Sequence, residues 1–244
     1  MKKTLLVCAA LCALASNAFA VGCDLTARAC PGGAGATQDW GTLDCAGGET
    51  VQLYGTFQVA EAIPDLVGID AILDLTVDGN VLDAANFWDL GTPGTNPGAL
   101  GGSHQRPATL CDAYEPTWDL GNSNFATLAA VQRPDRTRIA LMSYSPGEGI
   151  AVIPEQKLFG FSLTIDAATA LEANATGTAS GCAVGASIQL VQLFPGSLAG
   201  LPVTLLTGPN RPNGNVVTIN GGALPSLPTS TTHQSWGQLK SLYR

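Results

Sequence analysis

Residues 67–80 read VGIDAILDLTVDGN, and this stretch decides the fold. Its apolar and mostly polar positions alternate almost without a break: Val67, Ile69, Ala71, Leu73, Leu75 and Val77 against Gly68, Asp70, Ile72, Asp74, Thr76 and Asp78. A period of two residues is typical of a strand with one face toward a core. We therefore expect a strand with Asp74 on its solvated face, ending in a turn at Asp78-Gly79-Asn80.

The twelve residues that start at Asp74 also suggest a calcium loop with Asp74 and Asp78 as ligands. An EF-hand loop needs oxygen ligands at its first, third and fifth positions and a bidentate carboxylate at its twelfth. Here the third position is Thr76, the twelfth is Ala85, and a strand pattern precedes the loop. The strand interpretation is favoured, Asp74 and Asp78 remain the alternative metal ligands, and no cofactor is expected.

The same alternation recurs along the chain. It predicts a strand over residues 50–59 and further strands over 126–132, 138–145, 150–153, 157–165, 183–194, 202–206 and 215–219. A short helical turn with Phe87 and Trp88 and a Gly- and Pro-rich loop over residues 91–107 are expected between the early strands. Many short strands without a long helix predict an all-β sandwich.

The chain begins with a bacterial-style secretory leader, in which Lys2 and Lys3 precede an apolar run and Ala18-Phe19-Ala20 offers a cleavage site. No later segment approaches the roughly 18 apolar residues of a membrane span. The expected parts are a signal peptide (1–20), a Cys-containing segment (21–49), a sandwich domain (50–224), and a linker with a short tail (225–244). We expect secretion to the periplasm or cell surface, with lipid attachment at Cys23 as the alternative.

The net charge limits the classes of binding partner, and the cysteines suggest disulfides. The formal net charge of −8 disfavours nucleic acid and anionic membranes, which leaves an extracellular protein or a polysaccharide. Cysteines in an exported chain point to disulfides, and the candidates are Cys30, Cys45, Cys111 and Cys182. Cys30 with Cys45 would close a Gly-rich loop and Cys111 would join Cys182, although spacing alone does not define connectivity.

The sequence carries no recognisable catalytic constellation. Its two histidines, His104 and His233, fall in a loop and in the tail, and no Gly-x-Ser-x-Gly or His-Glu-x-x-His motif occurs. Six carboxylates could still converge for sugar hydrolysis, namely Asp70, Asp74, Asp78, Asp112, Glu115 and Asp119. We expect a non-enzymatic protein without catalytic residues, and a glycoside-acting enzyme stays as an alternative.

Two further features suggest binding. Trp88, Tyr114 and Trp118 lie in or beside the long loop, where they would either stack on a sugar or anchor the loop to the core. In the tail, Trp236, Leu239 and Tyr243 have helical spacing. Ten residues do not hold a helix alone in water, so the tail is expected to dock on its own domain or on another molecule.

Three ordered motifs resemble the cohesin family: IPDLVGIDAILDLTVDGNVLDA (63–84), RIALMSYSPGEGIAVIPEQKLFGFSLTI (138–165) and NVVTINGGAL (215–224). The resemblance implies a jelly-roll or Ig-like sandwich of about nine strands that binds a dockerin module through one sheet face. The chain departs from that family in its Cys-bearing start and its insertion over residues 91–107. We expect a recognition or surface-assembly module that binds a protein partner, with a carbohydrate-binding module as the alternative.

Overall fold

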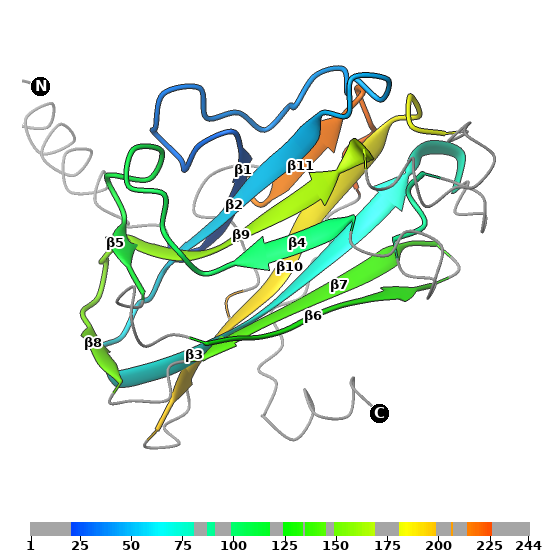
Figure 1. The fold of residues 1–244 in the computed structure, drawn as a ribbon. Coiled ribbons are helices and arrows are strands. Elements are labelled where there is room, and N and C mark those ends of the chain that lie inside the picture. Colours follow the sequence, from blue (N-terminus) through cyan, green and yellow to red (C-terminus); the bar gives the residue numbers. More distant parts are fainter. Residues whose placement is uncertain are drawn as a thin grey trace, which may run out of the picture.

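The computed structural model describes residues 21–80, 87–90, 99–117, 124–133, 135–144, 149–168, 181–198, 206 and 214–225, which form two packed β-sheets (Figure 1). Sheet 1 has the order β1 (Gly22–Ala27), β2 (Thr50–Gln58), β9 (Leu158–Asp166), β4 (Leu100–Ser103), with β5 (Glu115–Pro116) also on β9. Sheet 2 has the order β11 (Val216–Ile219), β10 (Ala186–Ser197), β3 (Ile63–Val77), β7 (Thr137–Tyr144), β6 (Asn124–Gln132), with β8 (Ile150–Val152) also on β3. The predicted all-β sandwich is confirmed.

The two sheets are antiparallel apart from the short parallel pair of β5 and β9. The edge strands of the two sheets face each other: β1 lies against β10 and β11, and β4 lies against β6. The side chains that the two-residue period places inward fill the space between them. Leu73 and Leu75 of β3 and Leu53 of β2 have no exposed surface. Each such side chain contributes about 2 kcal/mol through burial.

The side chains on the outer face of β3 are less exposed to solvent than the alternation predicts. Asp70, Ile72 and Asp74 point away from the main core, yet their exposed fractions are only 7%, 3% and 5%. The guanidinium of Arg138, directly across on β7, donates to both oxygens of Asp74 at 2.8 and 2.9 Å, and Arg136 donates at 3.0 Å. The expectation that Asp74 lies on a solvated face is therefore wrong, because cross-strand arginines cover it. The predicted turn is confirmed: η2 (Asp78–Asn80) follows β3, with Gly79 at φ 74°.

The described residues before Thr50 belong to the sandwich, because they include one of its strands. All six residues of β1 pair with β2, from Gly22 opposite Gln58 to Ala27 opposite Leu53. Cys23 lies in this strand with no exposed surface, so a lipid on its sulfur would have to displace core side chains. Attachment through Cys23 is thus incompatible with a paired β1.

Some other expectations also change. The stretch 91–107 is not all loop, because Leu100–Ser103 forms β4 against β9. Of the strand expected at 202–206, only Leu206 is described, and it bridges to Leu193. In the region expected to form a helical turn, residues 81–86 lie outside the described part, and Phe87 and Trp88 lie in a turn. Within the described residues, no helix has the length and apolar character that would span a bilayer.

The four candidate cysteines form two disulfides, but the pairing expected from the spacing is wrong. Cys30 joins Cys111 and Cys45 joins Cys182, with Cα–Cα distances of 4.9 and 6.2 Å. The two disulfides overlap along the chain: Cys45 lies between Cys30 and Cys111, and Cys111 lies between Cys45 and Cys182. They tie the segment after β1 to the region after β4 and to the residues before β10. Disulfides of this kind persist in oxidising compartments.

Candidate binding site at the edge of sheet 2

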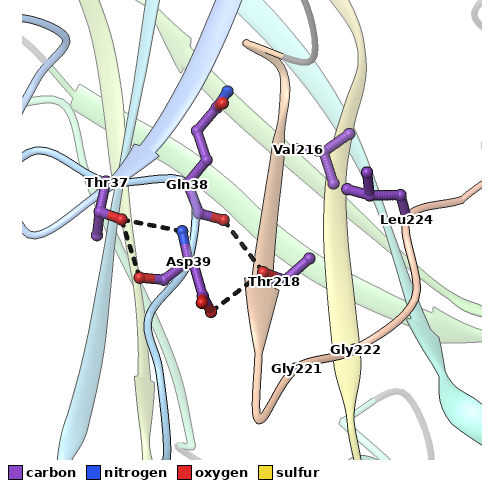
Figure 2. Close-up of a pocket in the computed structure, with 8 residues that line it drawn as sticks. All are labelled: Thr37, Gln38, Asp39, Val216, Thr218, Gly221, Gly222 and Leu224. Carbon is purple, nitrogen blue, oxygen red and sulfur yellow. Dashed lines mark hydrogen bonds between the residues drawn. The ribbon is translucent and has the colours of Figure 1, made fainter.

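A pocket of about 470 Å³ lies over β11, at the edge of sheet 2 (Figure 2). One wall is the segment of residues 37–39, the floor is β11, and the other wall is the chain that leaves β11. The eight lining residues are Thr37, Gln38, Asp39, Val216, Thr218, Gly221, Gly222 and Leu224. The pocket thus joins the part of the chain before β2 to the part after β11.

The first wall is an extra edge segment beside β11. Asp39 bridges Thr218 in parallel, with the Thr218 amide donating to the Gln38 carbonyl and the Trp40 amide to the Thr218 carbonyl, both at 2.8 Å. The Thr218 hydroxyl also donates to Asp39 Oδ1 at 3.2 Å, and the Gly41 amide donates to the same oxygen at 3.0 Å. Arg28 also stabilises this wall through a cation–π contact, because its guanidinium lies 4.5 Å from the centre of the Trp40 ring.

The second wall depends on a tight turn after β11. Gly221 has φ +67°, a conformation that glycine adopts without strain. A Cβ on Gly222 would lie 2.2 Å from the Ala186 carbonyl oxygen, so only glycine fits so close to β10. Asp78 orients the chain after Gly222, because its Oδ1 accepts a hydrogen bond from the Ala223 amide at 3.0 Å. This arrangement places Leu224 beside Val216 (Figure 2).

The pocket is lined by both polar and apolar groups. Thr37, Gln38, Asp39 and Thr218 supply hydroxyl, amide and carboxylate groups, whereas Val216 and Leu224 supply an apolar side. Of the lining residues only Asp39 is ionisable, and its carboxylate already accepts two hydrogen bonds. The lining thus combines polar groups, which can form hydrogen bonds, with an apolar side.

The expected aromatic platform is not formed by the residues that the structure describes. Trp88 has no exposed surface, packs edge to face on Phe87 at 4.8 Å, and donates its indole hydrogen to the Gly181 carbonyl at 3.0 Å. Tyr114 is 8% exposed and packs in a cluster that includes the Cys30–Cys111 disulfide. Stacking on a sugar needs an exposed ring face, so both rings act as anchors, and Trp118 lies outside the described residues.

The candidate carboxylates that the structure describes have separate surroundings. Asp74 is held by two arginines, Asp78 orients the chain exit, and Asp112 and Glu115 are exposed. Burial raises the pKa of Asp70 to about 6, while Asp119 is not among the described positions. In the described ranges no group of three His, Cys, Asp or Glu side chains could hold a metal. Asp74 and Asp78 lie four residues apart in the chain with separate structural partners, which argues against a shared ion.

His104 and Cys23 also lie away from the pocket. His104 follows β4 and is 8% exposed, and its burial lowers its pKa. Cys23 is outside both disulfides and its thiol donates to the Leu206 carbonyl, with burial raising its pKa well above the ordinary value. A thiol that stays protonated is a poor nucleophile. Neither group therefore supplies the described pocket with acid, base or nucleophile.

The residues that line this pocket were not identified from the sequence. Residues 37–39 lie between two cysteines, and the Gly221-Gly222 pair signalled only the end of a strand. Their proximity depends on β1 joining sheet 1, which brings the following segment to the edge of sheet 2. Comparison of the chain with protein-family models, curated proteins and solved structures gives no match.

Proposed function

We propose that this protein is a secreted, non-enzymatic recognition or surface-assembly module, which binds a protein partner on the outer side of sheet 2 at the β11 pocket. The observation that carries the proposal is the pocket itself. It is a hollow lined by polar groups of residues 37–39 and Thr218 and by the apolar side chains of Val216 and Leu224, on a sandwich cross-linked by two disulfides. A peptide segment offers the matching combination of main-chain hydrogen-bonding groups and apolar side chains.

The rigidity of the walls supports binding of a defined partner. The first wall is hydrogen-bonded to β11, and the second is held by Asp78 and by the close approach of Gly222 to β10. Walls that do not have to be ordered on binding save conformational entropy, which otherwise weakens association. The resemblance to cohesins makes a dockerin-bearing protein the first partner class to test. No described feature favours the carbohydrate or glycosidase alternatives, because the anchoring aromatics are buried and the carboxylates are dispersed.

The test compares the mature chain, residues 21–244, with Thr218→Arg, which fills the pocket with a long side chain. Gln105→Arg is the matched control, since it adds the same charge at an exposed position outside the pocket. Immobilised protein is presented with dockerin-bearing proteins, with and without calcium chelator, and with a random peptide library. We expect binding that Thr218→Arg lowers at least tenfold and Gln105→Arg leaves unchanged, with all melting temperatures within a few degrees.

The alternatives have their own measurements in the same samples. Binding to insoluble polysaccharide that survives Thr218→Arg would support a carbohydrate-binding module at another surface. Turnover of chromogenic glycosides that disappears on Asp74→Asn or Asp112→Asn would support an enzyme. Protein or peptide binding that is equal in the two arginine variants would place the partner elsewhere and contradict the pocket.

A further inference from the structure

A small apolar cluster lies on the outer face of sheet 2, separate from the main core. Its members are Ile72 of β3, 3% exposed, and Phe194 of β10, 5% exposed. Both are on the side of the sheet that faces away from sheet 1. A solvated outer face would leave such side chains largely open to water. Both side chains are nevertheless buried, which raises the question of what covers them.

A buried carboxylate marks the same patch. Asp70 stands directly opposite Phe194 on β10 and Met142 on β7, and its Oδ2 has no hydrogen-bond partner among the described residues. Asp70 is 7% exposed. A desolvated carboxyl oxygen of this kind favours a hydrogen-bond donor from the covering chain.

The register shows how near this patch lies to the C-terminal exit. Val216, Gln189, Asp74 and Arg138 form one row across sheet 2. Leu224 shares the β11 pocket with Val216, so the chain leaves at the level of this row on the outer side (Figure 2). Ile72 is two residues and Asp70 four residues further along β3, which is about 7 and 13 Å at strand spacing.

We propose that residues 226–244 turn back across the outer face of sheet 2 and cover the Ile72 and Phe194 cluster with Trp236, Leu239 and Tyr243. The spacing of these three side chains puts them on one side of a helix of about 15 Å, the width of about three strands. The linker is long enough, because Trp236 follows Leu224 by 12 residues, which reach about 40 Å when extended.

Charge favours the same placement. The segment 226–244 carries Lys240 and Arg244 and no acid, whereas the whole chain has a net charge of −8. The buried Asp70 carboxyl group gives the indole hydrogen of Trp236 a hydrogen-bond acceptor on the patch. The C-terminal segment is then an intramolecular cap for one sheet face. It docks on its own domain and not on another molecule.

Hydroxyl-radical footprinting of the mature chain tests the cap directly, because the labelling of a side chain follows its exposure. The variant replaces the three apolar tail residues (Trp236→Ala, Leu239→Ala, Tyr243→Ala). The matched control replaces three polar linker residues (Thr229→Ala, Ser230→Ala, Thr231→Ala). We expect labelling of Phe194 and Ile72 to rise several-fold in the tail variant only. Phe57, fully buried between the sheets, reports intact folding.

Unchanged labelling of Phe194 in the tail variant would overturn the proposal. Labelling of Phe194 that falls with rising protein concentration in the wild type would assign the cover to a second copy, and would also overturn it. If Phe57 becomes labelled as well, a photo-crosslinker in place of Trp236 decides. Intramolecular crosslinks to the peptides around Met142 or Phe194 support the cap, whereas crosslinks only to sheet 1, to other copies or to nothing contradict it.

Discussion

At the scale of single residues, Asp70 is a carboxyl group whose pKa changes strongly on folding. Its cross-strand neighbours Met142 and Phe194 carry no charge, and desolvation raises its pKa to about 6. In the unfolded chain the pKa is near 3.9. Between these values the folded protein binds a proton more tightly than the unfolded protein does. The free energy of unfolding contributed by Asp70 therefore falls as pH rises through this window.

We predict that Asp70→Asn removes this fall. From about pH 4 to about pH 6 the wild type should lose up to about 2–3 kcal/mol relative to the variant, because the buried carboxylate must ionise. Urea unfolding at several pH values measures the difference. Asp112→Asn, which removes one exposed carboxylate, is the control and should retain the fall. Parallel pH profiles of wild type and Asp70→Asn would contradict a raised pKa of Asp70 in the folded protein.

Gly55 in β2 shows how closely side chains pack at the surface of one strand. A Cβ at this position would lie 2.3 Å from two atoms of the Phe161 ring on β9, directly across. We predict that Gly55→Ala destabilises the protein by about 1–3 kcal/mol, because the ring must leave its place. Gly196→Ala is the control, since its nearest atoms lie at 3.7 to 3.9 Å. Equal denaturation midpoints for both variants would contradict this packing.

At the scale of elements, the disulfides join segments that lie far apart in the chain. Cys30–Cys111 spans 81 residues and Cys45–Cys182 spans 137, so both restrict the unfolded chain strongly. Loss of either bond is expected to lower the free energy of unfolding by about 2–4 kcal/mol. The Cys45–Cys182 bond lies near the residues that precede β10, at the end of the sandwich where β11 ends.

The predicted connectivity has a direct check. Non-reducing digestion of the mature protein should yield one peptide pair linked through Cys30 and Cys111 and another through Cys45 and Cys182. The double variants Cys30→Ser/Cys111→Ser and Cys45→Ser/Cys182→Ser should each unfold at lower denaturant concentration than wild type. Cys23→Ala controls for the loss of a cysteine, because it leaves both bonds intact. A peptide pair linking Cys30 to Cys45 would refute this arrangement.

At the scale of the whole molecule, the sandwich extends from β1 to β11 around one principal core. Leu25 of β1 has no exposed surface and belongs to the same cluster as Leu73 and Leu163. A strand that shares the core cannot unfold alone without exposing that cluster. The residues 21–49 and the rest of the sandwich should therefore unfold together.

Leu25→Ala tests this cooperativity. The cavity should destabilise the protein by about 2–5 kcal/mol and lower the single melting temperature by several degrees. Val21→Ala, at a partly exposed position just before β1, should change little. Differential scanning calorimetry measures both variants. Two separate transitions in the wild type, with only one of them shifted by Leu25→Ala, would indicate that the N-terminal segment is an independent unit.

The sequence by itself determined the strands and the inward side of most of them. Val51 to Phe57 and Ile69 to Val77 alternate with period two, a local property that each strand carries without knowledge of its neighbours. The turn at Gly79 is predicted by the sequence as well, because its turn residues are also a local property. These elements, with few exceptions, specified a sandwich before any pairing was known.

The tertiary structure alone decided the rest, because each remaining feature depends on contacts between residues distant in the chain. Cysteine spacing does not show which sulfurs meet, so only the folded arrangement distinguishes Cys30–Cys111 from Cys30–Cys45. The alternation alone predicts a solvated Asp74, and only the pairing of β3 with β7 brings Arg138 across from it. The pocket forms only where residues 37–39 meet β11, a proximity that no local pattern encodes.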